Sequence, residues 1–264
     1  MAGPAAKTIR PSDSFIQLGQ PDQEKGAEIL REFRRLGIAG DYYLEFELRV
    51  MPRRGEETVY TGRLWGSRNE LGPISRVVVD DAAGNQRRLL IQNGPNPAVW
   101  SWQNGQPSST AARLFDPLLP ATELTLFDLQ MPYLYWDDFI FEGVNKILGR
   151  AAHTFVLRPP TNSAYPALGA VRVQLDTQFH AMMQSTVLSP AGAEVKTLTV
   201  RDLKKVDDQW MVKAIDLRNE VTRDKTRFQV TRAALNLDLS PQVFSPESLG
   251  EAVTPPANTV SLGR

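Results

Sequence analysis

Residues suited to acid–base chemistry are few in this sequence. An acidic pair, Asp137-Asp138, stands beside a dense aromatic block, and burial against aromatic rings can raise a carboxyl pKa enough to make a general acid. Adjacent side chains rarely point the same way, however, and an aspartate ahead of a helical turn commonly caps that turn. We therefore interpret the pair as capping or turn residues and keep a hydrolase as the weaker alternative.

Other catalytic groups and metal ligands are scarcer still. The two histidines, His153 and His180, both fall in strand-like segments far apart in the sequence, where we expect hydrogen-bonded sheet residues. With no cysteine in the chain, disulfides, zinc ribbons, iron–sulfur clusters and thiol nucleophiles are excluded. The nucleophile elbow, Walker loop, zinc-protease and EF-hand motifs are missing as well. We expect no enzyme activity, no cofactor and no metal.

Composition narrows the classes of function that remain. The chain has 264 residues, of which 42% are hydrophobic and 23% charged, and its 30 basic and 30 acidic residues balance. A nucleic-acid partner is not expected, because displacing phosphate counterions needs surplus cations. No apolar run approaches ~18 residues, so we expect no membrane span. The first residues, 1–7, lack a charged stretch followed by an apolar one, so export would require a leader that has been removed.

The elements that must position any site follow from hydrophobic periodicity. Apolar residues at three-to-four spacing predict one amphipathic helix over 22–36. Strict alternation then begins in the next segment, with Leu44, Phe46, Leu48 and Val50 on one face. Further strands with short turns between them are predicted over 57–67, 75–80, 86–92, 99–103, 153–157, 169–176, 181–188, 195–206, 209–218 and 227–239.

The middle and the ends of the chain differ from this pattern. Prolines in 114–129 and a dense aromatic block in 132–141 favour helix or irregular loop. The segments 1–21 and 251–264 are predicted to be flexible, leaving 22–250 as a single domain. Because consecutive strands with short connections form an antiparallel meander, we predict an α+β fold. In it, a curved half-barrel sheet of about ten to twelve antiparallel strands has helices covering its concave face.

The aromatic residues leave two interpretations open. Trp65, Trp100, Trp102, Trp136 and Trp210 lie in or beside strands or in the aromatic block. They can fill the core, as large aromatics do in most β proteins. Alternatively, a half-open barrel leaves room for an apolar ligand under a helical lid. Composition does not decide between these readings.

The order of several short motifs resembles a known family. The run from Leu124 to Phe139 resembles a loop helix that ends in an aromatic–acidic turn, and Leu148-Gly149 then precedes a strand that closes at Pro159. Paired strands ahead of Gly192 and the closing run from Val243 to Leu249 continue the order. Over roughly 24–250 the chain is similar to outer-membrane lipoprotein-sorting proteins with the LolA/LolB-like fold.

This resemblance implies a function. It implies a non-enzymatic carrier or binding protein, in the periplasm or cell envelope of a Gram-negative-type bacterium, for lipoprotein acyl chains or another apolar ligand. Envelope proteins are possible partners. The alternative is an envelope interaction protein whose half-barrel is filled by its own side chains. From the residues themselves, we expect any cavity to lie between the concave sheet face and the aromatic block, with Met131 and the aromatics beside it as a lid. The expected ligand-binding residues are Phe46, Trp65, Met131, Tyr133, Tyr135, Trp136 and Phe139.

Overall fold

Two compact units make up the chain. The computed structural model describes residues 20–263 except 82, 104, 110–113, 162–164, 166 and 180. The first unit comprises residues up to Leu36 and Trp136–Thr199, and the second comprises Gly37–Tyr135 and the chain from Val200 onward. The sequence predicts a single domain over 22–250, whereas contacts cluster in these two units. The strand β11 (Glu194–Val206) has residues in both.

The first unit combines one helix with antiparallel strands. Helix α1 (Gln23–Arg35) begins at Asp22, whose carboxylate accepts hydrogen bonds from the backbone N–H groups of Glu24 and Lys25. The strands are ordered β7-β8-β9-β10, followed by the first part of β11. The bounds are Phe139–Ile147 for β7, Arg150–Leu157 for β8, Ala170–Asp176 for β9 and Met182–Leu188 for β10.

Helix α1 packs against β7. At Gly26 the helix comes so close that an added Cβ atom would lie 2.6 Å from the Cβ of Phe141. The side-chain amide of Gln23 also bonds with the backbone N–H and C=O of Phe141. The helix predicted over 22–36 is thus confirmed. Within its unit the helix packs on β7.

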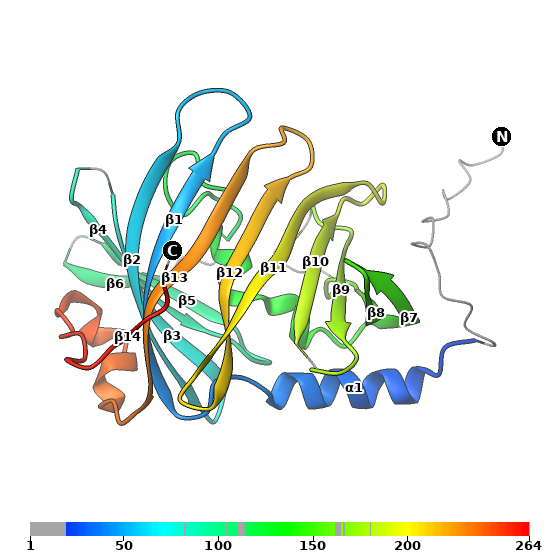
Figure 1. Ribbon diagram of the computed structural model, residues 1–264, viewed down its shortest axis with the longest axis horizontal. Coiled ribbons are helices and arrows are strands. Elements are labelled where there is room, and N and C mark those ends of the chain that lie inside the picture. The colour runs from blue at the N-terminus through cyan, green and yellow to red at the C-terminus, as the bar shows by residue number, and fades with distance from the viewer. Residues whose placement is uncertain are drawn as a thin grey trace. The chain divides into compact units, whose positions relative to one another are not determined.

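The second unit holds the other strands. Their order is β6-β5-β4-β3-β2-β1-β13-β12, continued by the second part of β11, and β14 pairs with β13 (Figure 1). The strand pairings among the described residues are antiparallel, so the antiparallel α+β class is confirmed. The bounds are β1 Asp41–Met51, β2 Thr58–Asn69, β3 Gly72–Asp80, β4 Gln86–Gln92, β5 Ala98–Gln103, β6 Gln106–Ser109, β12 Gln209–Asn219, β13 Lys225–Leu237 and β14 Val260–Ser261.

The second unit's sheet has two differently covered faces. Alternation along β1 buries Leu44, Phe46, Leu48 and Val50 on one face, as predicted. This is the cover face, named for the cover segment, residues 114–135. Tyr43 on β1 and its register partner Trp65 on β2 lie on the other face. This is the strap face, named for the strap, residues 238–262.

Both covering segments contain short helical turns. The cover segment holds α2 (Leu126–Gln130) and η2 (Pro132–Tyr135). The strap holds η3 (Pro241–Phe244), η4 (Glu247–Gly250) and β14, and it is drawn in orange to red in Figure 1.

Two segments differ from the sequence prediction. The aromatic block of 132–141 begins as the helical turn η2, but its last residues belong to β7, which starts at Phe139. There Phe139 and Phe141 pair in register with Leu157 and Phe155 on β8. The tail predicted to be flexible belongs in large part to the strap. Its Leu262 is buried, and Val253 packs against the cluster around Trp65. Prolines and small residues there suppress regular structure, but its apolar side chains still pack on the sheet.

Candidate functional site

The cover segment is shaped by local hydrogen bonds. Thr125 and Asp128 form a capping box, in which each side chain accepts from the other residue's backbone N–H. Helix α2 then ends after five residues at Met131, whose φ of 46° is left-handed. A second non-glycine residue, Ala121, has a φ of 61°. Such conformations are costly for residues with a Cβ atom, so these two joints bracket α2 with strained backbone.

Hydrogen bonds attach the cover segment to the sheet, and the half-buried Arg87 guanidinium on β4 donates two of them, to the carbonyls of Pro117 and Leu118. The Tyr60 hydroxyl donates to the Pro120 carbonyl at 3.2 Å. The Glu123 backbone N–H donates to the Thr226 hydroxyl at 2.8 Å. Tyr60 and Thr226 are register partners of Leu48 and Val50, so both bonds lie on the cover face.

The two sheet residues predicted for the cavity lie on opposite faces. Phe46 is 2% exposed and stacks on Phe228 with ring centroids 4.6 Å apart, on the cover face. Trp65 is 1% exposed and packs against Tyr43 at 5.2 Å on the strap face. The prediction that Phe46 and Trp65 line one site is therefore wrong. Phe46 pairs with Gly62 on β2, and Trp65 is three residues further along, which reverses the face in a strand.

The cover-segment residues predicted for the lid differ in burial. Tyr133 is 2% exposed, with its ring 5.5 Å from that of Phe127. Phe127 stacks in turn on Phe115, which is 44% exposed. Met131 and Tyr135 are half-buried. The cover segment thus combines a packed apolar interior with apolar groups that reach solvent.

The remaining two predicted residues belong to the first unit. Trp136 is buried, its ring lies 5.4 Å from that of Tyr165, and its carbonyl accepts from the Arg34 guanidinium. Burial raises the pKa of Tyr165 above its ordinary value. Phe139 meets Phe155 edge-on at 6.1 Å. These residues pack with neighbours of their own unit.

The acid–base candidates do not converge. Asp137 and Asp138 are exposed, and Asp138 pairs with Arg158 at 3.3 Å. The His153 ring packs 5.9 Å from that of Phe141, and His180 lies outside the described residues. Within the described ranges, no three acidic, histidine or cysteine side chains gather to hold a metal ion. Among the same residues, no helix is long and apolar enough to cross a membrane.

Sequence reasoning missed the residue that anchors the strap. Arg76 on β3 is 1% exposed, and its guanidinium donates to the hydroxyl and carbonyl of Ser248 at 3.1 and 3.0 Å and to the carbonyls of Val243, Leu249 and Glu251. Burial lowers the pKa of Arg76, as does the nearby Arg88, while Glu251 opposes the shift. A lone arginine within an apolar strand is the signal that could have revealed it, since buried charges need partners.

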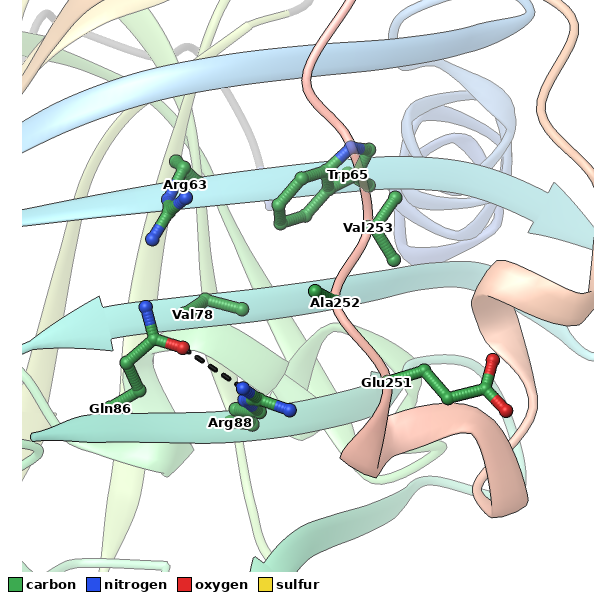
Figure 2. Close-up of a pocket in the computed structure, with 8 residues that line it drawn as sticks. All are labelled: Arg63, Trp65, Val78, Gln86, Arg88, Glu251, Ala252 and Val253. Atoms are coloured by element: carbon green, nitrogen blue, oxygen red, sulfur yellow. Dashed lines mark hydrogen bonds between the residues drawn. The ribbon is translucent and has the colours of Figure 1, made fainter.

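A small pocket opens beside this anchor. It has a volume of about 80 Å³ and lies between strands β2–β4 and the strap (Figure 2). Val78 lies between Arg63 and Arg88 in the strand register, so the two arginines flank it. The pocket is lined by Arg63, Trp65, Val78, Gln86, Arg88, Glu251, Ala252 and Val253.

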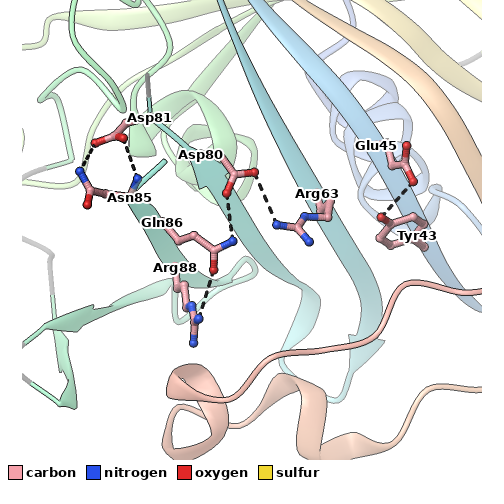
Figure 3. Close-up of polar contacts among 8 residues, drawn as sticks. All are labelled: Tyr43, Glu45, Arg63, Asp80, Asp81, Asn85, Gln86 and Arg88. Carbon is pink, nitrogen blue, oxygen red and sulfur yellow. Dashed lines mark hydrogen bonds and ion pairs between the residues drawn. The ribbon is translucent and has the colours of Figure 1, made fainter. Parts of the chain in front are cut away.

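A chain of polar contacts frames one side of the pocket. Arg63 pairs with Asp80 at 3.5 Å, and the Gln86 amide donates to the same carboxylate at 3.0 Å. Arg88 donates to the Gln86 side-chain oxygen at 3.1 Å (Figure 3) and to the Gly250 carbonyl of the strap. The frame therefore links three neighbouring strands and the strap.

Away from the strap, the same face of the sheet is charged. Asp216 on β12 receives two hydrogen bonds from Arg227 at 2.7 and 2.9 Å, and Arg201 and Lys225 approach it within 4 Å. Burial alone would raise the pKa of Asp216, but these cations hold it below its ordinary value. This part of the face is thus an ion-pair network.

Comparison with solved structures establishes the fold. A domain described as an outer-membrane lipoprotein-sorting protein, from Vibrio parahaemolyticus, is 18% identical with a TM-score of 0.74, covering 86% of this chain and 99% of that one. A DUF1329 family protein from Desulfovibrio piger is 12% identical with a TM-score of 0.72, covering 84% and 96%. A LolA superfamily protein from Nitrosomonas europaea is 14% identical with a TM-score of 0.63, covering 83% and 96%. The chain therefore has the LolA-like fold, as predicted.

Sequence comparisons add less. A family model described as an uncharacterized protein matches residues 121–251. A CinA-like protein from Microcystis aeruginosa is 23% identical over 201 residues, which cover 76% of this chain and 43% of that protein. The chain spans less than half the length of this curated relative.

Proposed function

We propose that this chain is a non-enzymatic carrier or binding protein for the acyl chains of lipoproteins, or for another apolar ligand, and that the cover segment is the lid the ligand displaces. The observation that carries the proposal is the construction of the cover face. A row of buried apolar residues is closed by a segment of short helical turns, which strained joints at Ala121 and Met131 bracket. Hydrogen bonds from Tyr60, Arg87 and the Glu123 backbone attach this segment to the sheet.

The chemistry of the cover segment suits exchange with an acyl chain. Side chains such as Phe127 and Tyr133 bury apolar surface, which stabilises by about 25 cal/mol per Å² regardless of orientation. An acyl chain offers the same kind of surface, so it can replace these side chains on the sheet at little net cost. Opening also relieves the left-handed backbone at the two joints.

The fold supports a location and partners. The Vibrio parahaemolyticus domain, which has the same fold, is described as part of an outer-membrane lipoprotein-sorting protein. By analogy of fold, this chain would act in the periplasm or cell envelope of a Gram-negative-type bacterium. There it would receive an acylated lipoprotein or a lipid and meet other envelope proteins.

A second candidate is favoured by a specific observation. Phe46 and Tyr133 are each 2% exposed, so other side chains of the protein already surround both rings. In this alternative, the cover segment is a permanent plug, and the protein is an envelope interaction protein without a transported ligand.

A reversible lock on the cover segment separates the two. The hydrogen bond from Glu123 to Thr226 places these residues side by side, and the chain has no cysteine of its own. Glu123→Cys combined with Thr226→Cys therefore introduces one addressable disulfide. Binding of a fluorescent fatty acid is measured by titration in the oxidised and reduced protein, and each single-cysteine variant is the control.

A carrier should bind the probe when reduced and lose at least tenfold in affinity when oxidised, because the lid can no longer move. The single variants should bind equally in both conditions. If the unmodified chain does not bind the probe, or if the lock does not change its affinity, the carrier proposal fails and the plug remains.

A further inference from the structure

The pocket between the strap and strands β2–β4 carries an unbalanced charge. Three guanidinium groups, those of Arg63, Arg76 and Arg88, lie on the strap face of adjacent strands. Asp80 pairs with Arg63, and Glu251 acts electrostatically on Arg76. In the part of the chain that the structure describes, Arg88 has hydrogen bonds to Gly250 and Gln86 but no carboxylate partner. One positive charge is left over, and this matches a monoanion.

Two buried N–H donors lie on this face of β2 and β3. The indole Nε1 of Trp65 and the Nε of Arg76 are buried without a hydrogen-bond partner among the described residues. Trp65 and Arg76 face each other in the register of β2 and β3, which puts their side chains on the same face as neighbours. Buried N–H groups normally have acceptors, so this region of the strap face offers more donors than the protein satisfies.

The walls of the pocket are both apolar and cationic. The Trp65 ring, Val78, Ala252 and Val253 provide the apolar part, and Arg63 and Arg88 flank Val78. In Figure 2 the Glu251 carboxylate extends away from Arg63 and Gln86, toward the helical turns of the strap. A volume of about 80 Å³ admits a small molecule rather than an acyl chain.

We propose that this pocket binds a short-chain organic monocarboxylate, with its carboxylate held by the guanidinium groups of Arg88 and Arg63 and its short apolar end against Trp65 and Val78. Guanidinium groups suit this role because their N–H donors match carboxylate geometry in charge-assisted hydrogen bonds. The site lies on the strap face, so it is separate from the acyl-binding proposal, and either can fail alone.

Nuclear magnetic resonance of the ¹⁵N-labelled full chain tests the proposal directly. The Trp65 indole resonance is identified by its loss in Trp65→Phe. Sodium butyrate is titrated at constant ionic strength, with butyramide as the neutral isostere and inorganic phosphate as the competing anion. We expect a saturable shift of the Trp65 resonance with butyrate and none with butyramide.

Three variants define the site. Arg88→Gln should weaken butyrate binding about tenfold or more, since a charge-assisted hydrogen bond is removed. Ala252→Trp, at an exposed position of the pocket wall, should abolish binding by filling the pocket while leaving every charge in place. Arg54→Gln, in an exposed turn, should change nothing.

Specific outcomes overturn the proposal. An unmoved Trp65 resonance excludes the site, and a response to phosphate with none to butyrate excludes the carboxylate class. A butyrate response that survives in Ala252→Trp would mean diffuse attraction to arginines rather than a pocket. Because Ala252 is exposed, this variant remains informative even where Arg88→Gln loosens the strap.

Discussion

The two faces of the second unit's sheet are closed by different physical means. On the strap face, the buried guanidinium of Arg76 reaches five acceptors of the strap. On the cover face, Phe46, Phe228 and their neighbours pack against each other. The cover segment is held by hydrogen bonds of Tyr60 and Thr226 and by those of the half-buried Arg87 guanidinium to two cover-segment carbonyls. Charge-assisted bonds are directional and depend on particular acceptors, whereas apolar packing accepts any surface of suitable shape. A buried cation with five acceptors therefore dominates the hold on the strap, whereas the cover segment depends mainly on apolar packing.

Cavity creation on the cover face should have the largest effect. Phe46→Ala removes a buried ring that stacks on Phe228, and such changes cost about 3–5 kcal/mol of unfolding free energy. Urea unfolding measures the loss, and Phe46→Leu, which keeps most of the volume, should cost far less. A loss from Phe46→Ala as small as that from Phe46→Leu would mean that the cover face is poorly packed.

Removal of the strap anchor should follow in size. Arg76→Met keeps the length and the apolar stem but removes every donor, so we expect a loss of about 3 kcal/mol and faster proteolysis within the strap. Arg54→Met, in an exposed turn, is the matched control. If proteolysis instead speeds up in the cover segment and spares the strap, the assignment of Arg76 as the anchor is wrong.

Matched caps on the two segments sharpen the comparison. Thr125 caps α2 in a buried capping box, and Ser240 caps η3 in the strap with one exposed hydrogen bond. Thr125→Ala should lower the unfolding free energy by about 1 kcal/mol, and Ser240→Ala by less, because Arg76 holds the strap independently. Chemical denaturation of both variants checks the order, and equal losses would contradict it.

The smallest expected effect is on the stability of the protein in acid, through the ion-pair network around Asp216. Because the cations around Asp216 lower its folded pKa, its contribution to stability is present above the unfolded pKa, about 3.9. This contribution is lost as pH falls through the folded value. It should not exceed about 1 kcal/mol, since the network is partly solvated. Asp216→Asn should lower stability at neutral pH but leave it unchanged in strong acid; a constant difference would refute this.

Local patterns determined most elements from the sequence alone. The alternation that ends at Val50, the helix capped by Asp22 and the strand over Gln86–Gln92 all follow from neighbours within a few residues. These signals are short-range, because side-chain period and capping depend on nearby backbone geometry. The resemblance to the LolA-like fold likewise rested on the order of local motifs.

Tertiary structure alone decided which side chains meet. In the sequence, Phe46 and Trp65 are both apolar residues of predicted strands. Only the register of β1 with β2 shows that they lie on opposite faces. The strap's apolar residues are too sparse to predict an element until the strap face receives them, and Arg76 is intelligible only beside Ser248 and Glu251. Register and long-range hydrogen bonds join residues far apart in the chain, so no local pattern encodes them.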